Sequence, residues 1–403
     1  MLKVLMFGWE FPPFISGGLG TACYGLTKGL SSKGVDITFV LPKALQNGTS
    51  SHVDIVIANK DDQVPVTMYE VNSLLRGYLT NEQYLKEWNE RPKEGTITNQ
   101  AAYGKNLYEE VYKFAEKALS IANDKDFDII HAHDWMTYPA AMAAKHATGK
   151  PMVLHIHNTV FDRYGDDSNR HEFNIEYQGF QMADTVIAVS EWTKQRLVNY
   201  YNVNPDKIKV VHNAVEFDGY TDYGLRSDDK IVLSLGRVTR QKGLMHLLWS
   251  AKKAIDYDPE IKFVIGGTGD MVPQLKEETH NLGIEENVIF SGWLSGKDID
   301  RAYQNASLFI MPSISEPFGI MPLEAMRNKT PVIISKQSGV SEVINHCLKV
   351  DFWDIDQMAN KIVSVIRYKE LQDTLRENGH KEIYEISWDT QAERCLDVYN
   401  MVL

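Results

Sequence analysis

Glu316 and Glu324 flank a predicted strand-to-helix turn, and their types and spacing could bind a polar ligand. An apolar run over 308–312 predicts a buried strand before the turn, and residues 322–328 predict a helix that begins with a proline. The free amides of 319–321 would then surround the positive end of that helix, where anions bind. A ligand with an anionic middle and hydroxyls at both ends, such as a sugar nucleotide, would suit this turn. The alternative is that both glutamates are ordinary acids at a helix start.

Two cations and a glycine-rich loop follow the next candidate strands. Arg237 and Lys242 come after the apolar run 230–235, at the carboxyl end where open α/β sheets bind ligands. Arginine can bind a diphosphate bidentately, and lysine adds a point charge. With 42 basic and 54 acidic residues the chain has a net charge of -12, so this isolated pair is informative, although a solvated basic loop is the alternative. Gly267 predicts a second close approach of backbone to ligand, and Trp293 a backbone contact for a base.

Four histidines stand in pairs at the ends of two predicted strands. His131 and His133 end one strand, and His155 and His157 end another. Because alternate residues of a strand face the same way, each pair can present two imidazoles together. A metal-dependent hydrolase is therefore an alternative, but no later cluster of aspartate or histidine completes a ligand set. We expect no metal, and we expect these histidines to be hydrogen-bonded core residues or to contact substrate.

The composition limits the kinds of partner that the chain can bind and indicates its cellular compartment. A chain this acidic repels nucleic acid and anionic membranes, so a phosphate site must rest on a few local cations and amides. No apolar run approaches the length of a membrane span, and the early break at Gly8 argues against a signal peptide. Three cysteines without a Cys-x-x-Cys pair predict buried free thiols. We expect a cytoplasmic protein without stable membrane insertion, and its oligomeric state stays open.

The elements that position these residues begin with a βαβ unit. Residues 3–7, 21–32 and 35–41 predict its strand, helix and strand. A loop with Gly17 and Gly18 lies between the first strand and the helix. Such glycines allow a backbone to approach a ligand closely, although a tight turn is an equal interpretation.

Two series of strands and helices predict two domains. The composition turns polar over 216–229, which predicts a linker, and a new series of strands begins at residue 230. Near the end, the pattern predicts a helix over 341–345 and then helices only. A chain of 403 residues exceeds one common core. We therefore predict an α/β fold with two Rossmann-like units, 1–216 and 217–386.

Five motifs follow one another along the chain: Gly17-Gly18-Leu19, His131-Ala132-His133-Asp134-Trp135, His157-Asn158, Gly236-Arg237 with Lys242-Gly243, and Glu316-Pro317-Phe318-Gly319 with Glu324. In this order they resemble the two-domain glycosyltransferases of the GT-B architecture, most closely the retaining glycogen and starch synthases and their bacterial and archaeal relatives. The resemblance spans nearly the whole chain. It implies two Rossmann-like domains that face each other across a cleft, with a last helix over 387–403 that returns to the first domain.

The resemblance also implies a role for each matching residue. Arg237 and Lys242 would bind the donor diphosphate and stabilise the leaving group. Glu316 would bind the donor sugar, Glu324 the ribose, and His157 would lie near the anomeric carbon. In the same way, Gly17 and Gly18 would approach the phosphates, His133 and Asp134 would lie close to the sugar and acceptor, and the amides of Phe318, Gly319, Ile320 and Met321 would assist at sugar and phosphate.

The implied reaction moves glucose from ADP- or UDP-glucose to the non-reducing end of an α-1,4-glucan, with retention and without a metal. Ser16 departs from the pattern, because glycogen synthases usually carry a lysine there. The spacing from Glu316 to Glu324 is similar to that of a broader retaining family that includes sucrose-phosphate synthases. Two alternatives therefore stay open: a retaining transferase that makes another polysaccharide or a small glycoside, and a sugar-nucleotide epimerase on the same fold.

Overall fold

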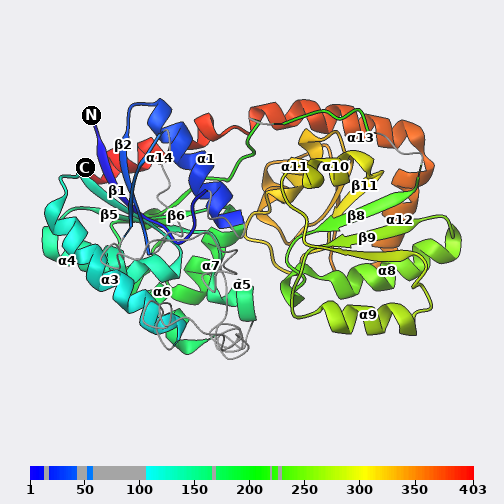
Figure 1. Cartoon of the computed structure of the whole chain (residues 1–403), viewed down its shortest axis with the longest axis horizontal. Coiled ribbons are helices and arrows are strands. Elements are labelled where there is room, and N and C mark those ends of the chain that lie inside the picture. The colour runs from blue at the N-terminus through cyan, green and yellow to red at the C-terminus, as the bar shows by residue number, and fades with distance from the viewer. Residues whose placement is uncertain (13–17, 43–51, 58–105, 166–168, 218–219, 226–228) are drawn as a thin grey trace, which may run out of the picture.

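The computed structural model describes residues 1–12, 18–42, 52–57, 106–165, 169–217, 220–225 and 229–403. These residues form two lobes that lie side by side, each built on one parallel β-sheet flanked by helices (Figure 1). We call the lobe with the seven-stranded sheet the first lobe and the lobe with the six-stranded sheet the second lobe. The predicted α/β fold with two Rossmann-like domains is confirmed.

The first lobe has the strand order β3-β2-β1-β4-β5-β6-β7. Its strands are rich in apolar residues, as is usual where helices cover both faces of a parallel sheet. The strands are β1 (Lys3–Phe7), β2 (Asp36–Leu41), β3 (Asp54–Ile57), β4 (Ile129–His133), β5 (Met152–Ile156), β6 (Thr185–Ala188) and β7 (Ile208–Val210). The helices are α1 (Gly18–Ser32), α3 (Leu107–Asp124), α4 (Tyr138–Thr148), α5 (Val160–Tyr164), α6 (Arg170–Met182) and α7 (Glu191–Tyr201).

The second lobe has the strand order β10-β9-β8-β11-β12-β13 and a core around Leu247, Phe263 and Ile310. Its strands are β8 (Ile231–Leu235), β9 (Lys262–Gly266), β10 (Val288–Gly292), β11 (Leu308–Met311), β12 (Val332–Ser335) and β13 (Leu348–Val350). Its helices are α8 (Leu244–Tyr257), α9 (Val272–Asn281), α10 (Lys297–Asn305), α11 (Met321–Arg327), α12 (Ile355–Arg367) and α13 (Lys369–Glu382).

The last helix, α14 (Trp388–Val402), crosses back and lies beside α1 of the first lobe (Figure 1). Two glycines of α1 make room for it. A Cβ atom at Gly25 would lie 2.1 Å from the Trp388 indole, and one at Gly29 would lie 2.7 Å from the Trp388 carbonyl oxygen. The first lobe is therefore completed by the C-terminal end of the chain.

The region after β12 differs from its prediction. In place of a helix over 341–345, a single 3-10 turn spans Gly339–Glu342, and the unpredicted strand β13 follows it. Ser341 Oγ donates to the carbonyl oxygen of Ser338 at 2.6 Å. Serine side chains that bond to the local backbone in this way compete with helix formation.

Two further expectations concern cysteines and membranes. Cys23, Cys347 and Cys395 are buried and free, as predicted. Within the described ranges, no helix combines the length and apolar character needed to cross a bilayer.

Both sheets have the same switch point in their strand order. β1 lies between β2 and β4, and β8 lies between β9 and β11. Chain connections leave in opposite directions from such a point and open a crevice at the carboxyl ends of the strands. The start of α1 and the loop after β5 in one lobe, and the loops after β8, β9 and β11 in the other, line a single cleft.

Candidate active site

A cleft of about 320 Å³ lies between the lobes, a volume typical of small-molecule sites. Most residues predicted from sequence reach its wall: Gly18, His157, Arg237, Lys242, Gly267, Trp293, Glu316, Phe318, Gly319, Ile320, Met321 and Glu324. Gly17 and Ser16 lie outside the described residues. His133 and Asp134 lie behind the wall.

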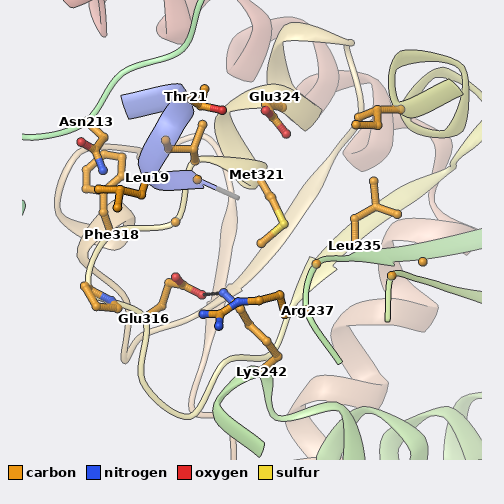
Figure 2. Close-up of a pocket in the computed structure, with 18 of the residues that line it drawn as sticks. Leu19, Thr21, Asn213, Leu235, Arg237, Lys242, Glu316, Phe318, Met321 and Glu324 are labelled. Carbon is orange, nitrogen blue, oxygen red and sulfur yellow. Dashed lines mark hydrogen bonds and ion pairs between the residues drawn. The ribbon is translucent and has the colours of Figure 1, made fainter. Parts of the chain in front are cut away.

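One end of the cleft gathers the predicted cations around a carboxylate. Figure 2 shows the side chains of Arg237 and Lys242 converging on Glu316. Lys242 Nζ lies 2.5 Å from Glu316 Oε2, and Ser313 Oγ donates to the same oxygen at 3.0 Å. Two cations and one carboxylate leave a net positive charge at this end. A diphosphate would be attracted there.

The backbone beside these cations consists of glycines whose loops are in close contact. Gly267 has a φ of 126°, and a Cβ atom there would lie 1.8 Å from the carbonyl oxygen of Gly236. Gly236 donates its amide to Gly266 O at 3.0 Å. Only glycine allows the loops after β8 and β9 to touch in this way. The contact fixes the position of the turn that carries Arg237.

The loop before α11 forms another part of the wall. Gly319 has a φ of 97°, a conformation that favours glycine. The amides of Gly339 and Val340 donate to Glu316 O at 2.9 Å and Phe318 O at 2.8 Å, which ties this loop to the turn after β12. Helix α11 spans Met321–Arg327, within one residue of the predicted range at each end.

Glu324 lies at the other end of the cleft, near Thr21 of the first lobe (Figure 2). Tyr303 Oη donates to Glu324 Oε2 at 3.0 Å. Burial raises the pKa of Glu324, while Arg327 and the bond from Tyr303 act in the opposite direction. Its carboxylate is thus held in place beside the cleft, where it can accept hydrogen bonds from the hydroxyls of a ligand.

His157 reaches the cleft from the end of β5, and a buried layer holds it. Its amide donates to Asp134 Oδ1 at 2.6 Å, and the amide of Asn158 donates to the same oxygen at 3.3 Å. His133 Nδ1 lies 3.0 Å from His157 Nε2. His133 and Asp134 have no exposed surface, so neither side chain forms part of the cleft wall. They support His157 from behind instead.

The turn after β4 determines which way the Asp134 carboxylate points. Asp134 has a φ of 61°, which is strained for a residue with a Cβ atom. Its amide donates to His155 O at 3.0 Å, so the turn is bonded to β5. The carboxylate therefore faces the main chain at His157 rather than the cleft.

A buried ionic cluster on α5 and α6 supports the turn after β5, which carries His157 and Asn158, and was missed from sequence. Arg163 Nη1 donates to Asn158 O at 2.6 Å, while Nη2 lies 2.8 Å from Glu172 Oε2 and 2.9 Å from Glu176 Oε1. Burial raises the pKa of Glu176 to about 7, although Arg163 opposes the shift. These acids look like ordinary surface residues of a helix in the sequence, so only the folded packing reveals them.

Side chains from the two lobes also meet beside the cleft. Ser190 Oγ donates to Pro317 O at 2.6 Å, and Ser315 Oγ donates to Asp162 Oδ1 at 2.5 Å. The carboxylate of Glu342 accepts bonds from the first two amides of α7 at 2.8 and 2.7 Å. The loop that carries Glu316 is therefore held by the first lobe as well as by its own.

Several wall residues were not identified as ligand contacts from sequence. They are Leu19, Thr21, Asn158, Asn213, Leu235, Ile299 and Tyr303. Asn213 follows β7 at the same edge of the sheet as His157, and this position was the only feature in the sequence that indicated a contact with ligand. The apolar members carry no signal, because an apolar side chain near a strand end usually belongs to the core.

Comparison with known proteins gives two matching family models. Residues 16–218 match the model described as Glycosyltransferase Family 4, and residues 221–382 match the model described as Glycosyl transferases group 1. The two matches together cover both lobes.

Three individual proteins illustrate the similarity. An uncharacterized glycosyltransferase of Methanocaldococcus jannaschii is 29% identical over 100% of this chain and 99% of its own. Alpha-maltose-1-phosphate synthase of Mycolicibacterium smegmatis is 26% identical over 70% of this chain and 81% of its own. Sucrose-phosphate synthase from Thermosynechococcus elongatus has the same fold, with a TM-score of 0.78 and 18% identity over 100% of this chain and 99% of its own.

Proposed function

This chain belongs to the glycosyltransferases of family 4, and from that premise we propose that it moves glucose from a nucleotide-glucose donor to the non-reducing end of an α-1,4-glucan. We propose further that the transfer retains the anomeric configuration and needs no metal ion at the donor phosphates. The observation that carries the proposal is the convergence of Arg237, Lys242 and Glu316 opposite His157 in one cleft.

The donor would lie along the cleft with its diphosphate at the cationic end. Arg237 can contact two phosphate oxygens with its planar fork, and Lys242 adds a mobile charge. Glu324 would accept bonds from the ribose hydroxyls, and the amides of the loop from Phe318 to Met321 would assist at sugar and phosphate. The exposed indole of Trp293 borders the space that remains for a base.

Departure of the nucleoside diphosphate is the step that the cations assist. The bond between the anomeric carbon and the phosphate oxygen breaks, and negative charge grows on the leaving group. Preorganised cations stabilise that charge without reorganisation, and removing one such donor typically costs about 10²–10³ in rate. Two fixed cations and glycine amides thus supply what a metal ion supplies in other sites.

The positions of the carboxylates bear on which retaining mechanism the cleft could support. In the described part of the cleft wall, the carboxylates are Glu316 and Glu324, and both belong to the second lobe. On the first-lobe side, His157 offers an imidazole and a main-chain carbonyl. Neither group can form the glycosyl ester that a carboxylate nucleophile forms as a covalent intermediate. We therefore favour attack by the acceptor from the face that the leaving group vacates, over a covalent intermediate on a carboxylate.

A second candidate has a sugar phosphate as its acceptor. It is favoured by the printed names of two similar proteins, alpha-maltose-1-phosphate synthase and sucrose-phosphate synthase. The donor half of the cleft would be the same in both cases. The two candidates differ only in what enters from the first-lobe side.

The deciding experiment incubates the purified chain with EDTA and either ADP-glucose or UDP-glucose. Parallel reactions contain maltooligosaccharide, glycogen, a hexose phosphate or no acceptor. Released nucleotide and product mass are measured, and proton NMR gives the anomeric configuration of the new bond. Growth of an α-linked chain supports the first candidate and identifies the base.

The other outcomes separate the alternatives. A product with the mass of a disaccharide phosphate selects the second candidate. Conversion of the donor sugar without an acceptor product indicates an epimerase. An inverted anomeric configuration would refute the proposed attack from the leaving-group face. Loss of all activity with EDTA that is restored by added Mg²⁺ would refute transfer without a metal ion at the donor phosphates.

A further inference from the structure

Four histidines stack inside the first lobe, beneath the cleft: two in β4, one in β5 and one directly after β5. The rings of His131 and His133 have centroids 4.5 Å apart at an interplanar angle of 21°, and those of His155 and His157 lie 4.4 Å apart at 22°. His131, His133 and His155 are at most 1% exposed. The proposed transfer uses only His157, so the other three imidazoles require a separate explanation.

Their hydrogen bonds are incomplete in a specific pattern. His131 Nδ1 lies 2.5 Å from Tyr399 Oη of α14, and His133 Nδ1 lies 3.0 Å from His157 Nε2. The Nε2 atoms of both residues, and both ring nitrogens of His155, are buried and have no hydrogen-bond partner among the residues that the structure describes. Leaving such polar atoms unpaired in the interior is costly, so their number in one place indicates a missing ligand.

We propose that His131, His133 and His155 bind a divalent transition metal ion of the zinc type. One ring nitrogen from each residue lies within 4.8 Å of the other two. Three points at that spacing all lie within about 2.8 Å of a common centre, so shifts of about 0.7 Å bring them to a normal Zn–N distance. The sequence placed these histidines at the ends of two strands, and the pairing of β4 with β5 brings three of them together.

The surroundings suit such an ion. Burial lowers the pKa of His131 to about 3 and those of His133 and His155 well below their usual range, so the rings are neutral, which is the ligating form. The carboxylate of Asp134, the next residue after His133, brings negative charge to the same strand end. Three imidazoles leave one tetrahedral position, which a water molecule can fill.

Binding would also affect the cleft. With Nε2 of His133 on the metal, its Nδ1 carries the proton and donates to His157 Nε2, which places the remaining proton of His157 on Nδ1. Tyr399 would orient His131 in the same way through α14. The ion would therefore position His157 from inside the lobe, without contacting a substrate.

The test measures metal content rather than activity. Tag-free full-length protein is stripped with a chelator under mildly destabilising conditions, incubated with Zn²⁺, freed of loose metal by gel filtration, and analysed by inductively coupled plasma mass spectrometry. We expect about one Zn²⁺ per chain. Titration with Co²⁺ should give the visible absorption bands of a tetrahedral site with nitrogen ligands, a result that needs no variant.

Substitutions then locate the site. His155→Phe and His131→Phe keep a flat ring in the stack and should each weaken Zn²⁺ binding by at least about tenfold. His146→Phe on the exposed end of α4 is the matched control and should bind as the unaltered chain does. Circular dichroism without metal verifies folding of each variant. Unaltered protein that retains no Zn²⁺ and shows no tetrahedral Co²⁺ bands, or folded His155→Phe with full Zn²⁺ content, would overturn the proposal.

Discussion

Replacement of Lys242 by alanine is the most direct test of the cationic end of the cleft. In the absence of donor, Lys242 Nζ lies 2.5 Å from Glu316 Oε2, and the two side chains are 13% and 10% exposed. With donor bound, the same ammonium group would face the departing diphosphate. Loss of one preorganised charged donor at such a position costs about 3–4 kcal/mol in the transition state, so kcat should fall about 10²–10³-fold.

Folding should change much less than turnover in this variant. Glu316 keeps the bond from Ser313 Oγ, and Arg237 lies close by, so its charge is not left isolated. We expect a loss of about 1 kcal/mol in unfolding free energy, measured by urea titration. The assay is initial rate of nucleotide release at saturating donor.

The matched control is Lys336→Ala. Lys336 also belongs to the second lobe and pairs with a carboxylate, Asp351, at 2.7 Å, but it is half exposed and lies outside the cleft wall. Its removal should leave kcat within about twofold, as for most surface substitutions. Turnover of Lys242→Ala within tenfold of the unaltered chain, with the same protein folded, would refute the assignment of Lys242 to the leaving group.

Three further substitutions test the contact with the nucleotide base, the support of His157 by Asp134, and the raised pKa of Glu176. Trp293→Ala should raise the KM for donor about tenfold through lost ring contact, whereas Trp353→Ala, equally exposed but outside the cleft wall, should not. Asp134→Asn weakens charge-assisted bonds to the amides of His157 and Asn158, so kcat should fall about tenfold in a chain that still unfolds cooperatively. The pKa of Glu176 rises from 4.5 in a free side chain to about 7 in the fold, so the folded state holds its proton more tightly. Its contribution to stability is therefore fully present below pH 4.5 and is lost as the pH rises to 7. Glu176→Gln cannot lose a proton, so the difference in Tm between it and the unaltered chain should shift in favour of the variant over that interval, and a constant difference would contradict the raised pKa.

Much of the site could be predicted because the fold is one of parallel sheets. Apolar runs identify the strands, and parallel strands of one sheet end at a common edge, so Arg237 and Glu316 could be placed near one another from their positions after β8 and β11. His157 follows a strand of the other sheet, and its place across the cleft was expected only from the resemblance. Gly267 was identifiable for a similar reason, since only glycine tolerates the backbone contact with Gly236. Each of these features depends on a few neighbouring residues, so it can be recognised in the sequence alone.

The remainder depends on contacts between distant segments. Whether Asp134 faces the cleft or the main chain at His157 is decided by one positive φ angle, which no residue pattern encodes. The support from Arg163 needs the packing of α5 on α6, and the bond from Ser190 to Pro317 needs the closeness of the two lobes. The third histidine of the buried cluster became a neighbour only through the pairing of β4 with β5.

The ion pair of Lys242 with Glu316 has a consequence for which ligands bind well. Without donor, each group neutralises the other at 2.5 Å. A nucleoside diphosphate alone would draw both Lys242 and Arg237 toward its phosphates and leave Glu316 with only the bond from Ser313, which is costly. A nucleotide sugar instead brings phosphate oxygens for Lys242 and hydroxyl donors for Glu316, so both groups exchange one partner for another.

The exchange of partners predicts opposite effects of one substitution on two ligands. Glu316→Gln removes the charge that holds Lys242, so a nucleoside diphosphate should bind the variant about tenfold more tightly than it binds the unaltered chain. The nucleotide sugar should bind the variant no more tightly, because the amide replaces a charged acceptor for its hydroxyls with a neutral one. Isothermal titration of both ligands on both proteins gives the four affinities. Equal affinity of the diphosphate for both proteins would mean that the pair does not restrain Lys242, and the selectivity for a complete donor would then have to arise elsewhere in the cleft.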